Sequence, residues 1–348
     1  MKKNIKLLAL TILVYGIPIL FWSVVPFSKN LWGSFTSDFI FNYLFYGKIT
    51  YSSIGIIFDI LLLYSIYLLF KKETPIEQER VCLIWSGLGR VFHWVFSDKL
   101  RKELVISKEE KVSVLFYLVK LFFTPVMFGF LIDNISSLTH SLSLLSSHHE
   151  VTKSTLLTFY FPLTFYFILV LDTLIFAFGY VFESSRLKSV VKSVEPTALG
   201  WMAAVICYPP INNLTGNILG WYSSDFGDFG NVNINIITAL LSLFFFLIYL
   251  WASIALGFKA SNLTNRGIVS KGPYKYVRHP AYSAKNLSWW LMAIPAIKVY
   301  GFIAIFSLVG WSLIYFVRAL TEERHLSKDP DYVVYSEKVK YMFIPGIF

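Results

Sequence analysis

The chain has 348 residues, of which 56% are hydrophobic and 18% aromatic, while only 15% are charged. Together with a mean hydropathy of +0.60, this composition excludes an ordinary soluble globular domain and indicates an integral membrane protein. The formal net charge of +10 would suit a nucleic-acid partner. However, Lys and Arg concentrate in the polar stretches between apolar runs, which is typical of cytoplasmic loops of membrane proteins. We therefore expect no nucleic acid.

Eight apolar stretches reach or approach the roughly 20 residues that span a hydrocarbon core. They predict transmembrane helices at 5–25, 51–70, 112–133, 155–181, 197–211, 234–258, 280–297 and 299–317. The last two stretches are joined by almost nothing, and this predicts a helical hairpin with Lys298 at its tip. The expected fold is all-α: a polytopic integral membrane protein of about eight transmembrane helices with a C-terminal helical hairpin.

Most of the 31 Lys and Arg residues lie in the N-terminus, in the loops 71–111, 182–196 and 259–285, and in the tail from Arg318. With eight spans these segments share one side of the membrane, and the positive-inside rule makes this side cytoplasmic. Both termini are then expected in the cytoplasm, and the location is expected to be a bacterial inner membrane. The apolar stretch at 5–25 is expected to be a retained anchor. Anionic membrane lipids are expected as partners.

The chain divides into two regions of different character. Residues 1–195 consist mostly of Leu, Phe, Ile and Ser and predict a transmembrane scaffold of about four helices, whereas residues 196–348 carry the motifs. Cys82 and Cys207 are the only cysteines, so we expect no disulfide framework and no metal site. Asp172 lies inside the fourth predicted span, where an ionisable side chain is costly and therefore a candidate for function.

The first candidate site lies in the loop SNLTNRGIVSKGPYKYVRHPAYSAKN, which follows the sixth predicted span. Its two glycines, Gly267 and Gly272, permit tight turns or a close approach of the backbone to a ligand. Proline favours the first position of a helix, so Pro280 predicts a helix that begins directly after His279. The free N–H groups of this helix start would favour an anion. The polar side chains gathered there are Tyr274, Tyr276, Arg278, His279 and Tyr282.

A second cluster lies where the hairpin returns the chain to the same membrane face. Arg318 and Glu322 are four residues apart and share one face of a helix. The acidic pair Glu322 and Glu323 at the exit of an apolar helix is unexpected in a segment that only anchors the chain. Because the hairpin is short, it should bring this pair close to the Arg and His of the first cluster. Such groups can hold an amino acid moiety, ribose hydroxyls or a substrate carboxylate.

The string GPYKYVRHPAY, the hairpin, the sequence EERHL, a Tyr-x-x-Tyr segment and an apolar segment with proline follow one another here. Together they resemble the membrane methyltransferases related to isoprenylcysteine carboxyl methyltransferase and phospholipid N-methyltransferases. The resemblance covers about residues 260–348, and the Arg-His-Pro core with the downstream Glu pair is its most specific part. It implies S-adenosylmethionine in a cytoplasm-facing pocket and a lipophilic substrate that enters from the bilayer.

Matched by motif, the resemblance implies a cofactor pocket lined by Ile268, Val269, Tyr274, His279, Pro280, Ala281, Tyr282 and Glu322. Arg318 would orient the reacting head group of the substrate, which makes Arg318 and Glu322 the candidate catalytic residues. The chain departs from the family at Ala284, where Gly is usual, and at SKDPDY, which replaces a Phe-Gly step. The first change could tighten the pocket and the second alters the tail that closes it, but neither removes a polar group that the chemistry needs.

Three functions remain open at this point. The first is an S-adenosylmethionine-dependent methyltransferase acting on a lipid or isoprenoid-like acceptor: Arg318 would hold a carboxylate, whereas Glu322 or Glu323 would stabilise an amine or take its proton. The alternative is an NADPH-dependent membrane reductase of the sterol or steroid type, which shares a similar C-terminal helical arrangement and His and Tyr pattern. The third is a noncatalytic membrane or transport protein, for which Asp172 and Lys120 inside predicted spans give thin support.

Overall fold

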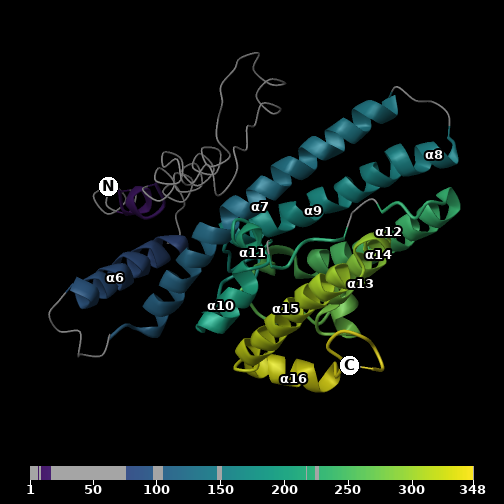
Figure 1. The fold of residues 1–348 in the computed structure, drawn as a ribbon. Coiled ribbons are helices and arrows are strands. Elements are labelled where there is room, and N and C mark those ends of the chain that lie inside the picture. The colour runs from purple at the N-terminus through teal and green to yellow at the C-terminus, as the bar shows by residue number, and fades with distance from the viewer. Residues whose placement is uncertain are drawn as a thin grey trace, which may run out of the picture.

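The structure is a computed structural model. The residues that it describes are 7, 9–16, 76–96, 105–146, 151–216, 218–223 and 227–347. In this part of the chain nearly all regular elements are helices, and the one sheet consists of two short strands. The all-α class expected from the sequence is therefore confirmed for these residues. Figure 1 shows the long helices running obliquely beside one another, with the short helix α16 near the C-terminal end of the chain.

The elements before residue 200 are η1 (Ile12–Gly16), α6 (Ile76–Phe96), α7 (Lys108–Ser146), α8 (Lys153–Thr155), η2 (Leu156–Tyr160), α9 (Phe161–Val181), β1 (Ser193–Val194) and the start of α10 (Ala198–Val205). The elements that follow are α11 (Ile211–Thr215), α12 (Val232–Leu256), η3 (Gly257–Lys259), β2 (Thr264–Asn265), η4 (Gly272–Lys275), α13 (Pro280–Met292), α14 (Ile294–Tyr300), α15 (Phe302–Leu326) and α16 (Pro330–Lys338).

Four helical segments of the described residues are long and apolar enough to cross a membrane. They are Lys108–Leu145, Lys153–Val181, Val232–Lys259 and Phe302–Leu326. The predicted spans that coincide with them are 112–133, 155–181, 234–258 and 299–317. These four segments are compatible with an integral membrane protein, because each carries the run of about 20 apolar residues that a hydrocarbon core requires.

The expected count of eight spans is not supported. The stretch 51–70 lies outside the described residues, as does most of 5–25. The stretch 197–211 holds α10, which has eight residues and ends at Val205, and the first residue of α11. Eight residues are too few to cross a bilayer, and the prolines at the end of this stretch prevent a longer helix.

The C-terminal hairpin also differs from the prediction. Its first arm is divided into α13, with 13 residues, and α14, with seven. The break coincides with Pro295, whose ring disfavours helical conformation at the residue before it. The turn into α15 is made by Gly301, which has a φ of +57°, so Lys298 lies inside α14 and not at the tip. Only the second arm is long enough to span a membrane.

Close packing of aromatic and small residues joins the helices. The rings of Phe123 on α7 and Tyr180 on α9 are stacked with their centroids 5.4 Å apart, and Phe165 on α9 meets Phe246 on α12 edge to face at 4.8 Å. At Gly179, an added Cβ atom would lie only 2.0 Å from the backbone oxygen of Ala260. The end of α9 therefore approaches the segment after α12 as closely as glycine allows.

The two short strands connect the segments that follow α9 and α12. β1 pairs antiparallel with β2. Backbone hydrogen bonds extend the pairing at both ends, from Lys192 N to Asn265 O at 2.8 Å and from Glu195 N to Leu263 O at 2.7 Å. This pairing places the segment around Glu195 beside residues 261–269, although about 70 residues of chain separate them.

Candidate functional site

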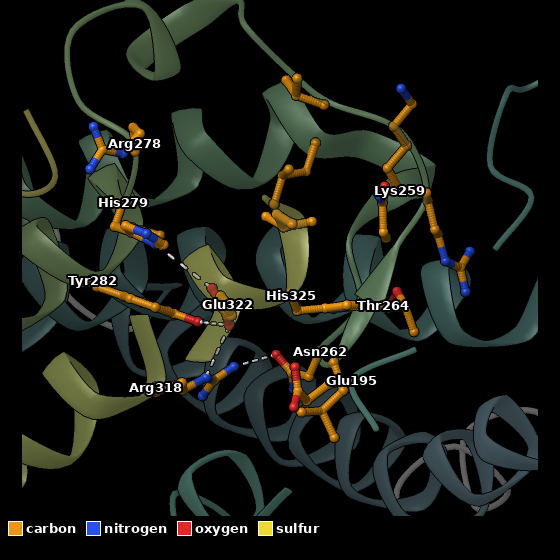
Figure 2. Close-up of a pocket in the computed structure, with 18 of the residues that line it drawn as sticks. Glu195, Lys259, Asn262, Thr264, Arg278, His279, Tyr282, Arg318, Glu322 and His325 are labelled. Atoms are coloured by element: carbon orange, nitrogen blue, oxygen red, sulfur yellow. Dashed lines mark hydrogen bonds and ion pairs between the residues drawn. The ribbon is translucent and has the colours of Figure 1, made fainter. Parts of the chain in front are cut away.

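A pocket lies where residues 261–269, the start of α13 and the last turns of α15 meet (Figure 2). The last turns of α15 contribute Arg318, Thr321, Glu322 and His325. They are spaced i, i+3, i+4 and i+7, so they share one helix face. The polar end of an otherwise apolar helix is therefore directed into the pocket.

Most of the site residues predicted from the sequence line this pocket. They are Ile268, Val269, Tyr274, His279, Ala281, Tyr282, Arg318 and Glu322. Pro280 is not among the lining residues: it is buried as the first residue of α13, directly after the N-cap His279. The helix thus begins where the sequence predicts, and the contribution of Pro280 is to begin it. Tyr276 is 60% exposed and also lies outside the lining, whereas Arg278 belongs to it.

Glu323 holds the Arg-His motif together. Its Oε1 atom accepts hydrogen bonds from Arg278 Nε at 2.8 Å and from the Tyr332 hydroxyl at 2.6 Å, and it lies 2.8 Å from His279 Nε2. Glu323 is absent from the pocket lining. Because its carboxylate is already engaged by three groups, its function is to position the motif.

Glu322 is the carboxylate that faces the pocket. Its Oε1 atom accepts a hydrogen bond from the Tyr282 hydroxyl and a longer one from Arg318 Nε at 3.4 Å. Its Oε2 atom lies 3.7 Å from His279 Nδ1. Figure 2 shows His279, Tyr282 and Arg318 converging on Glu322. The Glu322 side chain is 26% exposed, so a ligand in the pocket can reach it.

Arg318 is a buried cation surrounded by aromatic rings. Its guanidinium carbon lies 5.7 Å, 5.1 Å and 5.7 Å from the ring centres of Tyr208, Tyr282 and Tyr315. Arg318 Nη2 also donates to Asn262 Oδ1, and Asn262 Nδ2 donates to the Tyr208 hydroxyl at 3.2 Å. Cation–π contacts and hydrogen bonds compensate the cost of burying the charge. The guanidinium is therefore held in one orientation at the pocket wall.

The C-terminal tail closes over the motif. Arg278 Nη1 donates to the backbone oxygens of Val339 and Lys340, both at 2.8 Å. The backbone N–H of His279 donates to Met342 O at 2.8 Å. The tail predicted to close the site thus lies against the first cluster, despite its altered sequence.

Asp329 docks α16 on the strand pair. It is the N-cap of α16, and its carboxylate accepts hydrogen bonds from Asn265 Nδ2 at 2.8 Å and from Lys192 Nζ at 3.2 Å. Partial burial opposes ionisation, but the hydrogen bonds from Asn265, from the Asp331 backbone and from Lys192 hold the pKa of Asp329 below its usual range. The ionised form therefore fixes α16, whose Tyr332 lines the pocket.

The tyrosines of this region act as neutral donors. Burial raises the pKa of Tyr274, Tyr332 and Tyr335. In addition, the hydrogen bond from Tyr332 to Glu323 stabilises the protonated phenol. Their hydroxyl groups consequently keep their protons at physiological pH, and Tyr335 uses its own to hold the backbone oxygen of Tyr274 at 2.8 Å.

Asp172 lies beside the site but does not line it. Its carboxylate is buried and accepts hydrogen bonds from the hydroxyls of Tyr249 and Ser253 on α12. Tyr249 itself lines the pocket. Lys120, the other residue considered for a transport function, lies above the Phe116 ring, and its Nζ atom is 3.4 Å from the Val181 backbone oxygen. Of the two, only Asp172 is connected to the pocket by a hydrogen bond to a lining residue.

Several lining residues escaped the sequence analysis. Among the polar ones are Glu195, Lys259, Asn262, Thr321, Lys285 and His325. The spacing on α15 could have identified two of them, because Thr321 and His325 follow Arg318 at i+3 and i+7. Asn262 lies in the loop that begins SNLTNRG and could have been considered with it. Glu195 carries no comparable signal, since it reaches the pocket only through the pairing of β1 with β2.

The comparisons with known proteins match a segment of the chain that contributes part of this site. A family model described as "Protein of unknown function (DUF1295)" matches residues 228–339. The match covers less than half of the chain and lies inside the predicted C-terminal region 196–348. It includes α12, the motif at the start of α13 and the polar end of α15, but it does not include Glu195. No curated protein matches the chain.

Proposed function

We propose that the chain is an S-adenosylmethionine-dependent methyltransferase that acts at the cytoplasmic membrane face on a lipophilic carboxylate or amine, such as a lipid or isoprenoid-like molecule. One observation carries the proposal: the Arg-His-Pro-x-Tyr motif and Glu322 meet at one pocket. Tyr282 bonds to Glu322 and His279 lies beside it, although about 40 residues separate them in the chain. A hairpin that served only as an anchor would not require a buried polar network at its end.

The lining residues fit such a cofactor. The residues that would hold it are Ile268, Val269, Tyr274, His279, Ala281, Tyr282 and Glu322, all of which line the pocket. Bound S-adenosylmethionine would supply a methyl group activated by its sulfonium charge. Glu322 offers a partly exposed carboxylate to the ammonium or hydroxyl donors of a ligand. The apolar residues and the tyrosine rings would exclude water from the reacting atoms.

Arg318 and Glu322 would serve the acceptor. The fixed guanidinium of Arg318 suits a carboxylate head group, because its planar set of donors matches two carboxylate oxygens. If the acceptor is an amine, Glu322 would take its proton or stabilise its charge. The protein needs no covalent nucleophile for such a transfer, since its main contribution is the alignment of the two reacting groups.

The proposal puts the pocket on the cytoplasmic side, in a bacterial inner membrane, with both termini on the same side. Its support is the basic character of the segments around the pocket, 182–196 and 259–285. The opposite end of the helix bundle, near Lys153, would then face away from the cytoplasm. A lipophilic substrate would reach the pocket laterally from the bilayer.

An NADPH-dependent membrane reductase is the second candidate, and a group of lysines favours it. Lys259 lines the pocket, and Lys192, Lys188 and Lys271 are near enough to act on it electrostatically. A cluster of like charges suits a ligand with phosphate groups better than the cationic S-adenosylmethionine. The acidic pair and the Arg-His-Pro motif support the methyltransferase.

Ligand-induced stabilisation separates the two candidates, because a ligand that binds only the folded protein raises its melting temperature. The detergent-purified protein would be titrated with S-adenosylmethionine, S-adenosylhomocysteine and NADPH in parallel. We expect the two adenosyl compounds to stabilise it, and we expect Glu322→Gln to weaken their binding by roughly tenfold or more. Glu337→Gln, which changes an exposed carboxylate on α16, is the matched control. Stabilisation by NADPH alone would select the reductase.

A further inference from the structure

Glu195, next to the strand pair, lines the pocket, and one of its two carboxylate oxygens accepts no hydrogen bond from the described residues. The residue is 2% exposed and belongs to the pocket lining. Its Oε1 atom accepts hydrogen bonds from the backbone N–H of Thr197 at 3.1 Å, from the Thr197 hydroxyl and from Arg324 Nη2 at 2.8 Å. Its Oε2 atom is fully buried and has no hydrogen-bond partner among the described residues.

The backbone around Glu195 is built to keep this side chain in place. Glu195 N donates to Leu263 O at 2.7 Å, and Trp201 Nε1 donates to Glu195 O at 2.8 Å. A Cβ atom added at Gly200 would lie 2.4 Å from Glu195 Cγ, so only glycine leaves room for the carboxylate. A side chain fixed at so many points, with one polar atom left over, indicates an acceptor for a ligand.

The chemistry of the free oxygen selects the kind of donor. A buried carboxylate oxygen without a donor costs free energy, and an ionised carboxylate can only accept hydrogen bonds. Arg324 already compensates the charge of Glu195. The cations Lys259 and Arg318 also line the pocket, and Glu322 is the carboxylate proposed to receive the ammonium group of the ligand. A neutral hydroxyl donor satisfies the oxygen without adding charge.

We infer that Glu195 Oε2 accepts a hydrogen bond from a sugar hydroxyl of the bound ligand, the ribose of a nucleoside-type cofactor. Figure 2 shows Glu195 and Asn262 on one side of Glu322, with His279 and Tyr282 on the other. A ligand between them would have its sugar at Glu195 and its reacting end at Glu322 and Arg318. The inference rests on the proposed use of a nucleoside cofactor, and it assigns a role to a residue outside both the motif and the segment 228–339.

The test replaces the acceptor atom Oε2 by a hydrogen-bond donor and keeps the size and shape of the side chain. Glu195→Gln keeps an oxygen that can accept from Thr197 and Arg324, and it puts an N–H₂ donor in place of Oε2. Calorimetry would measure the binding of S-adenosylhomocysteine and of its 2′-deoxy and 3′-deoxy forms to the wild-type chain and to the variant. We expect removal of one hydroxyl to weaken wild-type binding by roughly 10- to 100-fold. In Glu195→Gln the hydroxyl loses its charged acceptor and can only accept from the neutral amide N–H₂, so its removal should weaken binding by roughly threefold or less.

The ratio of deoxy to ribo dissociation constants distinguishes ligand contact from a structural role. A structural role would lower the melting temperature of the ligand-free variant and leave this ratio as it is in the wild type, and that result would overturn the inference. Glu337→Gln, the same change at an exposed site, should retain the wild-type ratio. If the wild type binds NADPH and not S-adenosylhomocysteine, and Glu195→Gln weakens NADPH binding without lowering the melting temperature of the ligand-free protein, the inference stands while the methyltransferase proposal fails. If the wild type binds neither ligand, both fail.

Discussion

Two adjacent glutamates show that the position of a residue on a helix decides which groups its side chain contacts. Glu322 and Glu323 are both at the polar end of α15, yet only Glu322 lines the pocket. Successive residues on a helix point about 100° apart, so they meet different surroundings. Glu322 meets Tyr282 and Arg318, whereas Glu323 meets Arg278, His279 and Tyr332.

Glutamine at each of these positions should therefore have a different effect. Glu323→Gln weakens charge-assisted hydrogen bonds inside the motif, and we expect a loss of roughly 1–3 kcal/mol of stability in the ligand-free protein. Glu322→Gln should change the melting temperature of the ligand-free protein little but weaken ligand binding. Thermal unfolding with and without S-adenosylhomocysteine measures both effects. Equal losses of ligand-free stability in the two variants would contradict this assignment.

Arg318 should not tolerate lysine. An ammonium group cannot bond to Asn262 and Glu322 at once while lying against three aromatic rings. We expect Arg318→Lys to reduce ligand affinity or methyl transfer by roughly tenfold or more, the effect of losing a charged hydrogen bond. Arg90→Lys on α6 is the control, because the Arg90 side chain is 52% exposed, lies outside the pocket lining, and can keep its surface ion pair with Glu110 as lysine. Similar activity of both variants would refute the role of Arg318.

At the scale of the elements, the pocket depends on how closely α9, the strand pair and α16 approach one another. Gly179 lets the end of α9 touch the segment after α12, and Asp329 fixes α16 to β2. Both contacts join segments that carry pocket residues. Changes at either position should therefore act on the site without touching a ligand.

Gly179→Ala should destabilise the protein. The added methyl group would lie 2.0 Å from the Ala260 backbone oxygen, so α9 and this segment must move apart. Overpacking of this kind costs roughly 1–3 kcal/mol. Gly89→Ala in α6 is a suitable control, because its Cβ atom would meet nothing within 4 Å and alanine favours a helix. Thermal unfolding followed by tryptophan fluorescence should show a lower midpoint for Gly179→Ala only.

Acid should release α16. The pKa of Asp329 is held below its usual range, so its stabilising contribution is complete above about pH 4, the unfolded value, and is lost as the pH falls through the lower folded value. Asp329→Asn should remove this contribution at every pH. Hydrogen exchange of α16 between pH 5 and pH 3, corrected for the intrinsic rate, measures the release. Wild-type protection should fall over this range, and the variant should show low protection throughout. A fall of equal size in both proteins would contradict the prediction.

At the scale of the whole molecule, the long helices give the protein two ends. α12 has 25 residues and is about 37 Å long at 1.5 Å per residue, enough to cross a hydrocarbon core. Lys153 bonds to Asn233 at the start of this helix, at 2.8 Å, whereas Lys271 follows its end in the sequence. The pocket lies at the second end, where the basic segments gather.

Cysteine labelling tests the proposed orientation. In a background without Cys82 and Cys207, Lys153→Cys and Lys271→Cys each put one thiol at an exposed position. A membrane-impermeant maleimide applied to intact cells should label the first variant and leave the second unlabelled until the membrane is permeabilised. Labelling of Lys271→Cys in intact cells would reverse the proposed topology and place the pocket away from the cytoplasm.

The sequence by itself determined the features that depend on nearby residues. Apolar runs predicted the four membrane-length helices, because hydropathy accumulates along a continuous segment. Pro280 predicted the start of α13 through the fixed φ of its own ring. The proximity of the Arg-His motif to Glu322 also followed from the sequence, because a short hairpin returns the chain to the membrane face from which it started.

Only the tertiary structure decided what depends on contacts between distant segments. Averaged hydropathy at 280–297 did not reveal the break between α13 and α14, because the residues directly on both sides of it are apolar. The roles of Glu322 and Glu323 diverged because each faces different partners across the helix. Glu195 reached the pocket through β1 and β2, and no local pattern records a pairing between segments 70 residues apart. The sequence shows which side chains could bind a ligand. Which of them meet in one pocket depends on how the helices and strands pack together.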